Sequence, residues 1–389
     1  MARFSPNVAS LEPSPTLAIT ARARSLQAEG RSVVNLSAGE PSFPTPAAAA
    51  EGAAAGVAAG RTGYPPTPGL PELRDAVARY TTTTTGAADV TASRVLVSAG
   101  VKQALFNLVY SLFGEGDEIL LPAPYWPSYT AIVELSRARP VDVPLDWSDG
   151  FRLTADALEE HRTSRTRAVL INSPSNPSGA VASRQDLAGV LRWAGEHGIW
   201  VLSDEIYRRL YYMGDAAPSV LDVEDRPETV IALDGMSKAF SMPGWRIGWA
   251  VGPGDVIDRA ADLQSQTTSA AAGPSQLAAA AMLDSRGREA VIADFRMRLD
   301  ARRRSSLEGL RSVSGIEVID QPGAIYHYLR LADGSDCLAT AEALLLDGGV
   351  AAIPGAAFGT PGYLRITYAG DDAALAEGVR RIAAFFDGG

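Results

Sequence analysis

Cysteine is almost absent from this chain of 389 residues, which contains only Cys337. A single cysteine excludes an intrachain disulfide and any metal site built from several thiolates. Histidine is also scarce, because only His161, His197 and His327 are present, and they lack the spacing of metal ligands. We therefore expect each of them to be an ordinary surface or core side chain, and the sequence predicts no metal site.

Long apolar runs are missing as well. No stretch approaches the roughly 18 residues that a membrane-spanning helix needs. The N-terminus, Met-Ala-Arg-Phe-Ser-Pro-Asn, has no apolar signal-peptide core. We therefore expect a cytoplasmic protein with no membrane contact.

Positive charge is in deficit. The chain has 35 Lys and Arg against 45 Asp and Glu, for a formal net charge of −10 and a pI near 5.0. A nucleic-acid partner would require clustered basic residues, so this balance argues against one. The short basic run Arg302–Arg304 is expected on the solvated face of a long helix.

The chain is long enough for two domains with sizeable cores. Strand and helix patterns alternate from residue 94 onward, which is typical of an α/β fold. A helical pattern covers 255–283, and a longer amphipathic one covers 288–313. Further strand patterns follow. Apolar runs that read as buried strands are Val95–Ser98, Glu118–Leu121, Ala168–Ile171, Trp200–Ser203, Thr229–Leu233 and Ile247–Val251.

One lysine stands between two of these strands. Lys238 follows the run 229–233 and precedes the run 247–251, so it is predicted on a turn at the edge of the core. Partial desolvation there favours a neutral amine, which is nucleophilic toward carbonyl groups. Most lysines are simply solvated, so Lys238 by itself does not indicate a catalytic role, and support for one must come from the sequence around it.

Other polar groups follow predicted strands. Asp204 ends one strand, where α/β sheets bind ligands, and a buried carboxylate there needs a cationic partner. The residues Gly100–Lys102 open a helix directly after another strand, where free amides can bind phosphate. Trp126 follows a third strand and can stack on a heteroaromatic ring. Arg365 lies on a strand and has a guanidinium that fits a carboxylate.

Five motifs together resemble one family. They read S-K-A-F-S-M-P-G-W-R-I-G from residue 237, A-G-E-P from 38, N-P-S-G from 176, L-R-I-T-Y-A from 364, and Y-P-P-T-P-G-L-P-E-L-R from 64. The chain resembles the pyridoxal-phosphate-dependent aminotransferases of classes I and II, which have fold type I. The resemblance runs from about residue 4 to the C-terminus, and it is closest to bacterial aspartate and prephenate aminotransferases.

The resemblance implies pyridoxal 5'-phosphate as cofactor, with Lys238 forming the Schiff base. It also implies a homodimer in which Tyr64 reaches the cofactor phosphate of the neighbouring subunit. The other cofactor-binding residues that it implies are Ser237, Arg246, Gly100, Val101 and Lys102 at the phosphate, Trp126 and Asp204 at the pyridine ring, and Asn176 and Tyr207 at the phenolic oxygen.

The substrates implied are an L-amino acid and a 2-keto acid, exchanged by a ping-pong mechanism. A dicarboxylic donor such as aspartate and an acceptor such as 2-oxoglutarate are expected, because Lys102 can meet a second carboxylate with help from Thr16. Arg365 is expected to hold the α-carboxylate. The remaining substrate-binding residues implied are Gly39, Trp126 and Asn176.

The resemblance also implies a mostly parallel seven-stranded sheet and a smaller α/β domain. Residues 1–47 would form an N-terminal arm and part of the small domain, 48–285 the large cofactor-binding domain, and 286–389 the small C-terminal domain. Three features depart from the family pattern. Val101 is larger than the usual glycine or alanine, and Gly235 stands where many relatives have a phosphate-binding serine or threonine. The run Gln321–Tyr326, which reads Q-P-G-A-I-Y, differs from the usual P-x-G-A-F-Y.

Three other functions remain open to different degrees. A lyase or cyclase with the same cofactor would use the same residues, and the sequence separates it from a transaminase only weakly. A regulatory protein with an aminotransferase-like domain would need a DNA-binding segment and a basic surface. A nicotinamide dehydrogenase would need G-x-G-x-x-G, for which Gly114–Gly116 and Gly252–Gly254 are only partial matches.

Overall fold

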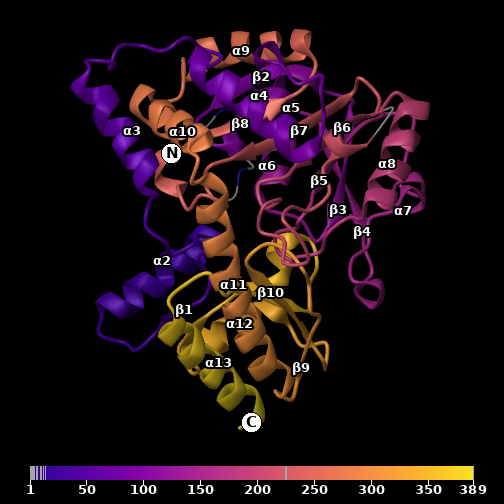
Figure 1. Ribbon diagram of the computed structural model, residues 1–389. Helices are drawn as coiled ribbons and strands as arrows, with labels where there is room; N and C mark the ends of the chain where they lie inside the picture. The colour runs from indigo at the N-terminus through magenta and orange to yellow at the C-terminus, as the bar shows by residue number, and fades with distance from the viewer. Residues whose placement is uncertain are drawn as a thin grey trace.

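The computed structural model describes residues 15–223 and 226–388, together with Ser5, Val8, Leu11 and Pro13. The N-terminal stretch that lacks a signal-peptide core lies mostly outside these residues. In Figure 1 a large sheet with its helices occupies the upper part of the molecule and a smaller sheet the lower part, and the long helix α11 (Arg288–Arg311) leads from one to the other. None of the described helices is long and apolar enough to cross a membrane.

The large sheet has seven strands in the order β2-β8-β7-β6-β5-β3-β4. Strand β8 runs antiparallel to both of its neighbours, and the other pairs are parallel. The predicted mostly parallel seven-stranded sheet is therefore confirmed. The strands are β2 (Val95–Ser98), β3 (Glu118–Ala123), β4 (Arg139–Pro144), β5 (Thr166–Asn172), β6 (Trp200–Asp204), β7 (Val230–Gly235) and β8 (Gly248–Val251).

Both faces of this sheet are buried. Leu170 of β5 packs into the core cluster on one face, and its neighbours Val169 and Ile171 pack into the cluster on the other. Strands covered on both sides need apolar residues at every position, which is why they appear as continuous apolar runs in the sequence. The helices that contribute to the first cluster include α5 (Val101–Leu112), α6 (Ser128–Leu135) and α9 (Gly254–Thr267). Those that contribute to the second include α3 (Ala47–Ala58), α4 (Pro71–Thr85), α7 (Ala155–Glu159), α8 (Arg184–His197) and α10 (Gly273–Asp284).

The strand ends that matter for function lie at one edge of the sheet. Asn172 at the end of β5 pairs with Asp204 at the end of β6. Ser98 at the end of β2 and Gly235 at the end of β7 both pair with Gly248. The loops that follow β2, β5, β6 and β7 therefore emerge side by side, where α/β sheets bind ligands.

The smaller sheet has four antiparallel strands in the order β12-β13-β10-β9. A separate parallel pair, β1 with β11, ties the N-terminal segment to this part of the chain. The amide of Thr367 also donates to the carbonyl of Leu36. The elements here are α2 (Pro15–Ala28), β1 (Val34–Asn35), β9 (Ile316–Val318), β10 (Tyr326–Leu331), α12 (Cys337–Leu346), β11 (Val350–Ala351), β12 (Ile353–Pro354), β13 (Tyr363–Thr367) and α13 (Asp372–Asp387).

Two local expectations were wrong. The helical pattern over 255–283 forms two helices, α9 and α10, because the first helix ends at Thr267 and the second begins only at Gly273. The run Arg302–Arg304 does not lie wholly on a solvated face, since Arg302 and Arg303 are buried and only Arg304 is exposed. Arg302 pairs with Asp372 of α13, and Arg303 pairs with Asp300 and Asp320, so these two arginines hold helices and strands together.

Candidate active site

A cavity of about 750 Å³ opens at the edge where these strands end. Every residue that the sequence predicts for the site lines it, apart from Tyr64 and Gly100. Its charged lining residues are five cations and two carboxylates: Arg24, Lys102, Lys238, Arg246 and Arg365 against Glu40 and Asp204. The cavity therefore carries a positive surplus that suits an anionic ligand.

Lys238 reaches the cavity from the turn after β7, as predicted. Its Nζ donates a hydrogen bond to the carbonyl of Gly39, which is 199 positions away in the sequence. It also lies 5.6 Å from the centre of the Tyr207 ring. The half-buried amine is thus held by one carbonyl and one aromatic face, with no carboxylate bound to it among the described ion pairs.

Asp204 is the buried carboxylate of the site, with 3% of its surface exposed. Its Oδ2 accepts from the Tyr129 hydroxyl over 2.8 Å and its Oδ1 from the Ile206 amide over 3.2 Å. Burial raises the pKa of Asp204 to about 6, while these hydrogen bonds and the charge of Lys238 act in the opposite direction. A cationic ligand group beside Asp204 would relieve this cost.

The start of α5 forms a pocket for an anion. The first amides of the helix, those of Val101 and Lys102, have no acceptor within the helix. Gly100 has φ +90°, and a Cβ there would lie 2.5 Å from the Arg246 guanidinium. Arg246 in turn donates to the carbonyls of Ala99 and Pro243 over 3.1 and 3.2 Å. Helix amides and a guanidinium thus converge on one point, which is the arrangement that binds phosphate.

The departures at Val101 and Gly235 have a structural basis. A Cβ on Gly235 would lie 2.8 Å from the carbonyl oxygen of Ile247 and 3.3 Å from Cγ2 of Val101. A serine or threonine does not fit at position 235 while β8 stays in place. The amides at the start of α5, Ser237 and Arg246 are the remaining groups there that can hold a phosphate.

Lys102 and Trp126 lie together in the cavity wall. The Lys102 ammonium sits 4.7 Å from the centre of the Trp126 ring. Burial lowers the pKa of Lys102, and the charge of Arg246 acts in the same direction, although much of the side chain faces the open cavity. Thr16 lines the same cavity from the start of α2, so both residues expected at a second carboxylate lie in its wall.

Arg365 is a buried cation, and it takes part in none of the ion pairs among the described residues. Its Nη1 donates to Oδ1 of Asn176 over 2.9 Å and its Nη2 to the carbonyl of Ser37 over 2.6 Å. Its Nε is buried and has no hydrogen-bond partner in the described structure. The guanidinium lies over the rings of Tyr326 and Phe358, at 4.3 and 5.1 Å from their centres. Burial lowers the pKa of Arg365, so an anion bound here would stabilise its charge.

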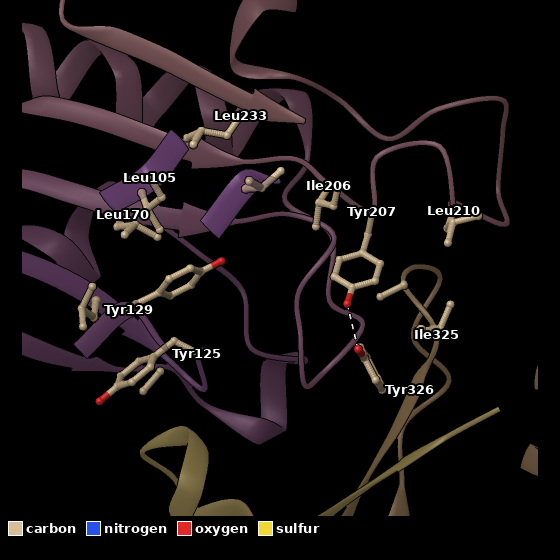
Figure 2. Close-up of a cluster of buried hydrophobic side chains, with 14 of the residues drawn as sticks. Leu105, Tyr125, Tyr129, Leu170, Ile206, Tyr207, Leu210, Leu233, Ile325 and Tyr326 are labelled. Atoms are coloured by element: carbon tan, nitrogen blue, oxygen red, sulfur yellow. Dashed lines mark hydrogen bonds between the residues drawn. The ribbon is translucent and has the colours of Figure 1, made fainter. Parts of the chain in front are cut away.

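Several residues that line the cavity were not predicted from the sequence, and four of them carry polar groups that matter for its chemistry. Figure 2 shows the hydroxyl groups of Tyr207 and Tyr326 pointing at each other, and their oxygens are 2.7 Å apart. Tyr129 lies three positions after Trp126, and Arg24 lies two turns along α2 from Thr16, so helical spacing was the available signal for these two. Other residues that reasoning from the sequence did not assign to the site are Tyr326 and Asn172, whose amide donates to the carbonyl of Asp204.

Tyr64 does not reach this cavity. Its side chain is fully exposed, at 101% of the reference area, on the proline-rich loop before α4. A residue that acts in the site of a neighbouring subunit would be exposed in a single chain. Its role in a homodimer stays a prediction.

The chain is similar to known proteins over nearly its whole length. The family model for aminotransferases of class I and II matches residues 31–382. The chain is 40% identical to an aspartate aminotransferase of Streptomyces avermitilis, covering 98% of this chain and 95% of that protein. It is 37% identical to a probable aspartate/prephenate aminotransferase of Aquifex aeolicus, over 96% of each. The structure of an aspartate aminotransferase from Thermus thermophilus with maleate superposes with a TM-score of 0.93 at 36% identity, covering 98% of this chain and 99% of that one.

Proposed function

The chain belongs to the class I and II aminotransferase family and is a transaminase, and from that premise we propose that it moves the amino group of aspartate to 2-oxoglutarate with pyridoxal 5'-phosphate as cofactor. The observation that carries the proposal is the convergence of Lys238, Asp204 and Arg365 in one positively charged cavity. The residues provide an amine, a buried carboxylate and a buried carboxylate-binding cation, and each has a separate task.

The residues present fit this cofactor. The free amides at the start of α5, with Ser237 and Arg246, suit its phosphate, and the absence of a Cβ at Gly100 leaves room beside the guanidinium. Asp204 suits its pyridine nitrogen, because the carboxylate is buried with no ion-pair partner among the described residues. When bound, pyridoxal phosphate supplies an electron sink that stabilises negative charge at the substrate Cα.

The residues around the proposed cofactor have different roles in the reaction. Asp204 keeps the ring nitrogen protonated, because an ionised carboxylate beside it raises the proton affinity of that nitrogen. Tyr207 and Asn176 would donate to the phenolic oxygen, and their presence in the cavity lining supports this assignment. The Lys238 amine carries the proton to and from the substrate Cα, because it is the basic group held at the cavity floor between Gly39 and Tyr207.

Arg365 and Asn176 hold the substrate α-carboxylate. Arg365 lines the cavity, and Nη1 and Nη2 each carry a second N–H besides the one given to Asn176 or Ser37, so a carboxylate can bind at this end of the guanidinium without displacing the bond to Asn176. Fixing the carboxylate orients the Cα–H bond toward Lys238 and replaces a diffusional encounter by a positioned one.

The choice of a dicarboxylic donor rests on Lys102. A second carboxylate in this cavity needs its own cation, and Lys102, which lies against Trp126, lines the cavity, as Thr16 does. The relatives named above include enzymes named for aspartate and for aspartate/prephenate. We propose aspartate as the donor and treat an aryl or cyclic dicarboxylate as the second substrate class to test.

The experiment is a donor and acceptor screen on the purified protein with added pyridoxal phosphate. We expect a visible absorbance band from cofactor bound to Lys238, and stoichiometric formation of oxaloacetate and glutamate from aspartate and 2-oxoglutarate. Lys238→Ala is expected to bind the cofactor but to lose steady-state turnover. Product release that does not require a keto acid would indicate a lyase, and near-native kcat in Lys238→Ala would overturn the assignment of Lys238.

A further inference from the structure

Tyr326 occupies a position between the two halves of the site. It begins β10, is 3% exposed and lines the cavity. Its hydroxyl lies 2.7 Å from that of Tyr207 (Figure 2), and its ring lies under the guanidinium of Arg365, 4.3 Å from ring centre to cation. Gly39 is also close, since a Cβ built on it would lie 2.5 Å from the Tyr326 hydroxyl oxygen.

The two phenols have one proton each for this contact, and either oxygen can be the donor. The proposed role of Tyr207 requires its own proton to point at the phenolic oxygen of the cofactor. If Tyr207 donated to Tyr326 instead, it would face the cofactor with lone pairs only. The direction of this single hydrogen bond therefore decides whether Tyr207 can act as a donor.

The surroundings favour Tyr326 as the donor. The Arg365 cation over its ring withdraws electron density from the phenol, which makes the O–H group a stronger donor. The backbone of Gly39 also lies close to this hydroxyl, and Tyr207 is its one hydrogen-bond partner in the described structure. A phenol that accepts a hydrogen bond also becomes a better donor itself, because successive bonds polarise one another.

We propose that Tyr326 is a positioning residue whose hydroxyl donates to Tyr207 and thereby holds the Tyr207 proton toward the phenolic oxygen of the cofactor. The inference rests on the proposed cofactor. Other ionisable groups face the same place: Asp204 from β6, Lys238 from the turn after β7, Arg365 from β13 and Tyr129 from α6. Because the Tyr326→Phe substitution leaves all of them in place, it isolates the hydroxyl.

The test measures the pH at which the visible absorbance of the lysine-bound cofactor changes, without substrate. A donor to the phenolic oxygen favours the unprotonated, more negative form of the chromophore. Tyr326→Phe is therefore expected to raise the apparent pKa of this transition by about 0.3 to 1 pH unit, the upper value corresponding to complete loss of the Tyr207 contact. Tyr207→Phe should raise it at least as far, and the double variant should match Tyr207→Phe alone.

Tyr328→Phe is the matched control. Tyr328 lies on the same strand two residues further on, but its hydroxyl contacts Thr360 and it does not line the cavity. Its removal is expected to leave the transition unchanged. Replacement of Tyr326 by 3,5-difluorotyrosine, which keeps the hydroxyl and makes it a stronger donor, should lower the apparent pKa and does not depend on the stability of the phenylalanine variant.

Each outcome decides the question. A Tyr326→Phe transition that coincides with those of the wild type and Tyr328→Phe would overturn the inference, and so would additive shifts in the double variant or a rise with difluorotyrosine. A wild-type protein with no visible band would instead contradict the proposed cofactor, so the two failures are distinguishable.

Discussion

Asn176 and Arg365 are 189 positions apart in the sequence, yet Nη1 of Arg365 donates to Oδ1 of Asn176 over 2.9 Å. Asn176 follows β5 of the large sheet, and Arg365 lies on β13 of the small one. The bond therefore joins the two sheets at the cavity. Asn176, which is proposed to donate to the phenolic oxygen of the cofactor, is therefore hydrogen-bonded to Arg365, which is proposed to bind the substrate α-carboxylate.

Arg365→Lys tests this arrangement. Lysine keeps the positive charge but loses the planar fork, so it cannot serve Asn176, Ser37 and a carboxylate together. Loss of one charge-assisted hydrogen bond is expected to cost about 2 kcal/mol, or roughly thirtyfold in kcat/KM for every amino donor. The measurement is steady-state kinetics with aspartate and alanine. A loss confined to aspartate would mean that Arg365 does not bind the common α-carboxylate.

Asp204→Asn tests the cost of the buried carboxylate. The pKa of Asp204 is raised from the ordinary 3.8 to about 6 in the folded protein. Between these two pH values the carboxyl group binds more protons in the native state than in the unfolded state. Its contribution therefore lowers the free energy of unfolding as the pH rises from about 4 to about 6. At about 1.4 kcal/mol per pH unit, the carboxylate costs the cofactor-free protein on the order of 3 kcal/mol at neutral pH.

Cofactor-free Asp204→Asn is accordingly expected to be more stable than the wild type at pH 7, with the difference disappearing near pH 4, while its transaminase activity falls. Denaturant unfolding at several pH values measures this. Asp234→Asn is a useful comparison, because burial raises the pKa of Asp234 to about 7 and its pH window extends higher. A difference in stability between the wild type and Asp204→Asn that does not change between pH 4 and 6 would contradict the prediction for Asp204.

The residues at strand ends were accessible to reasoning from the sequence. Lys238 and Asp204 follow continuous apolar runs, and runs of this kind become central strands whose ends share one edge. The motif resemblance supplied their roles. Tyr326 ends a run that differs from the family pattern P-x-G-A-F-Y, but no role follows from that comparison, because a tyrosine in an apolar strand pattern does not reveal which way its hydroxyl points or what it contacts.

The error at Arg302 and Arg303 has a related cause. A run of charges in an amphipathic helix usually faces solvent, and the sequence contains no sign that Asp372 and Asp320 come to these two positions from other elements. Long-range ion pairs depend on how α11 packs against α13 and the small sheet. Local pattern does not contain that information.

A mixed-dimer experiment tests the role of Tyr64, whose fully exposed side chain motivates it. If Tyr64 acts in the neighbouring site, a heterodimer of one Tyr64→Phe subunit and one Lys238→Ala subunit has one site with both defects and one intact site. Its active site should then show native cofactor affinity. If Tyr64 acts within its own subunit, neither site is intact and the affinity of the active one should fall to that of the Tyr64→Phe homodimer. A fully active monomer would exclude shared sites.

The donor preference can be assigned to one of two cations. Lys102 and Arg24 both line the cavity, and neither has an ion-pair partner among the described residues. Lys102 lies beside Trp126 at the start of α5, where the helix field also favours an anion. Arg24 lies on α2 one turn beyond Thr20, whose hydroxyl is hydrogen-bonded to that of Ser37. Since the carbonyl of Ser37 also accepts from Arg365, the helix that carries Arg24 is linked to the α-carboxylate end of the cavity.

We therefore expect Lys102→Ala to reduce kcat/KM for aspartate by roughly thirtyfold, equivalent to about 2 kcal/mol, and to affect alanine little at saturating cofactor. Arg24→Met should lower kcat/KM for both donors to a similar, smaller extent that vanishes at high salt, because an exposed cation near the cavity attracts anions over distances that salt screens. Arg22→Met, on the same helix but not lining the cavity, is the control. An aspartate-selective loss in Arg24→Met with equal losses for both donors in Lys102→Ala would transfer the second carboxylate from Lys102 to Arg24, leaving Lys102 to balance the cofactor phosphate.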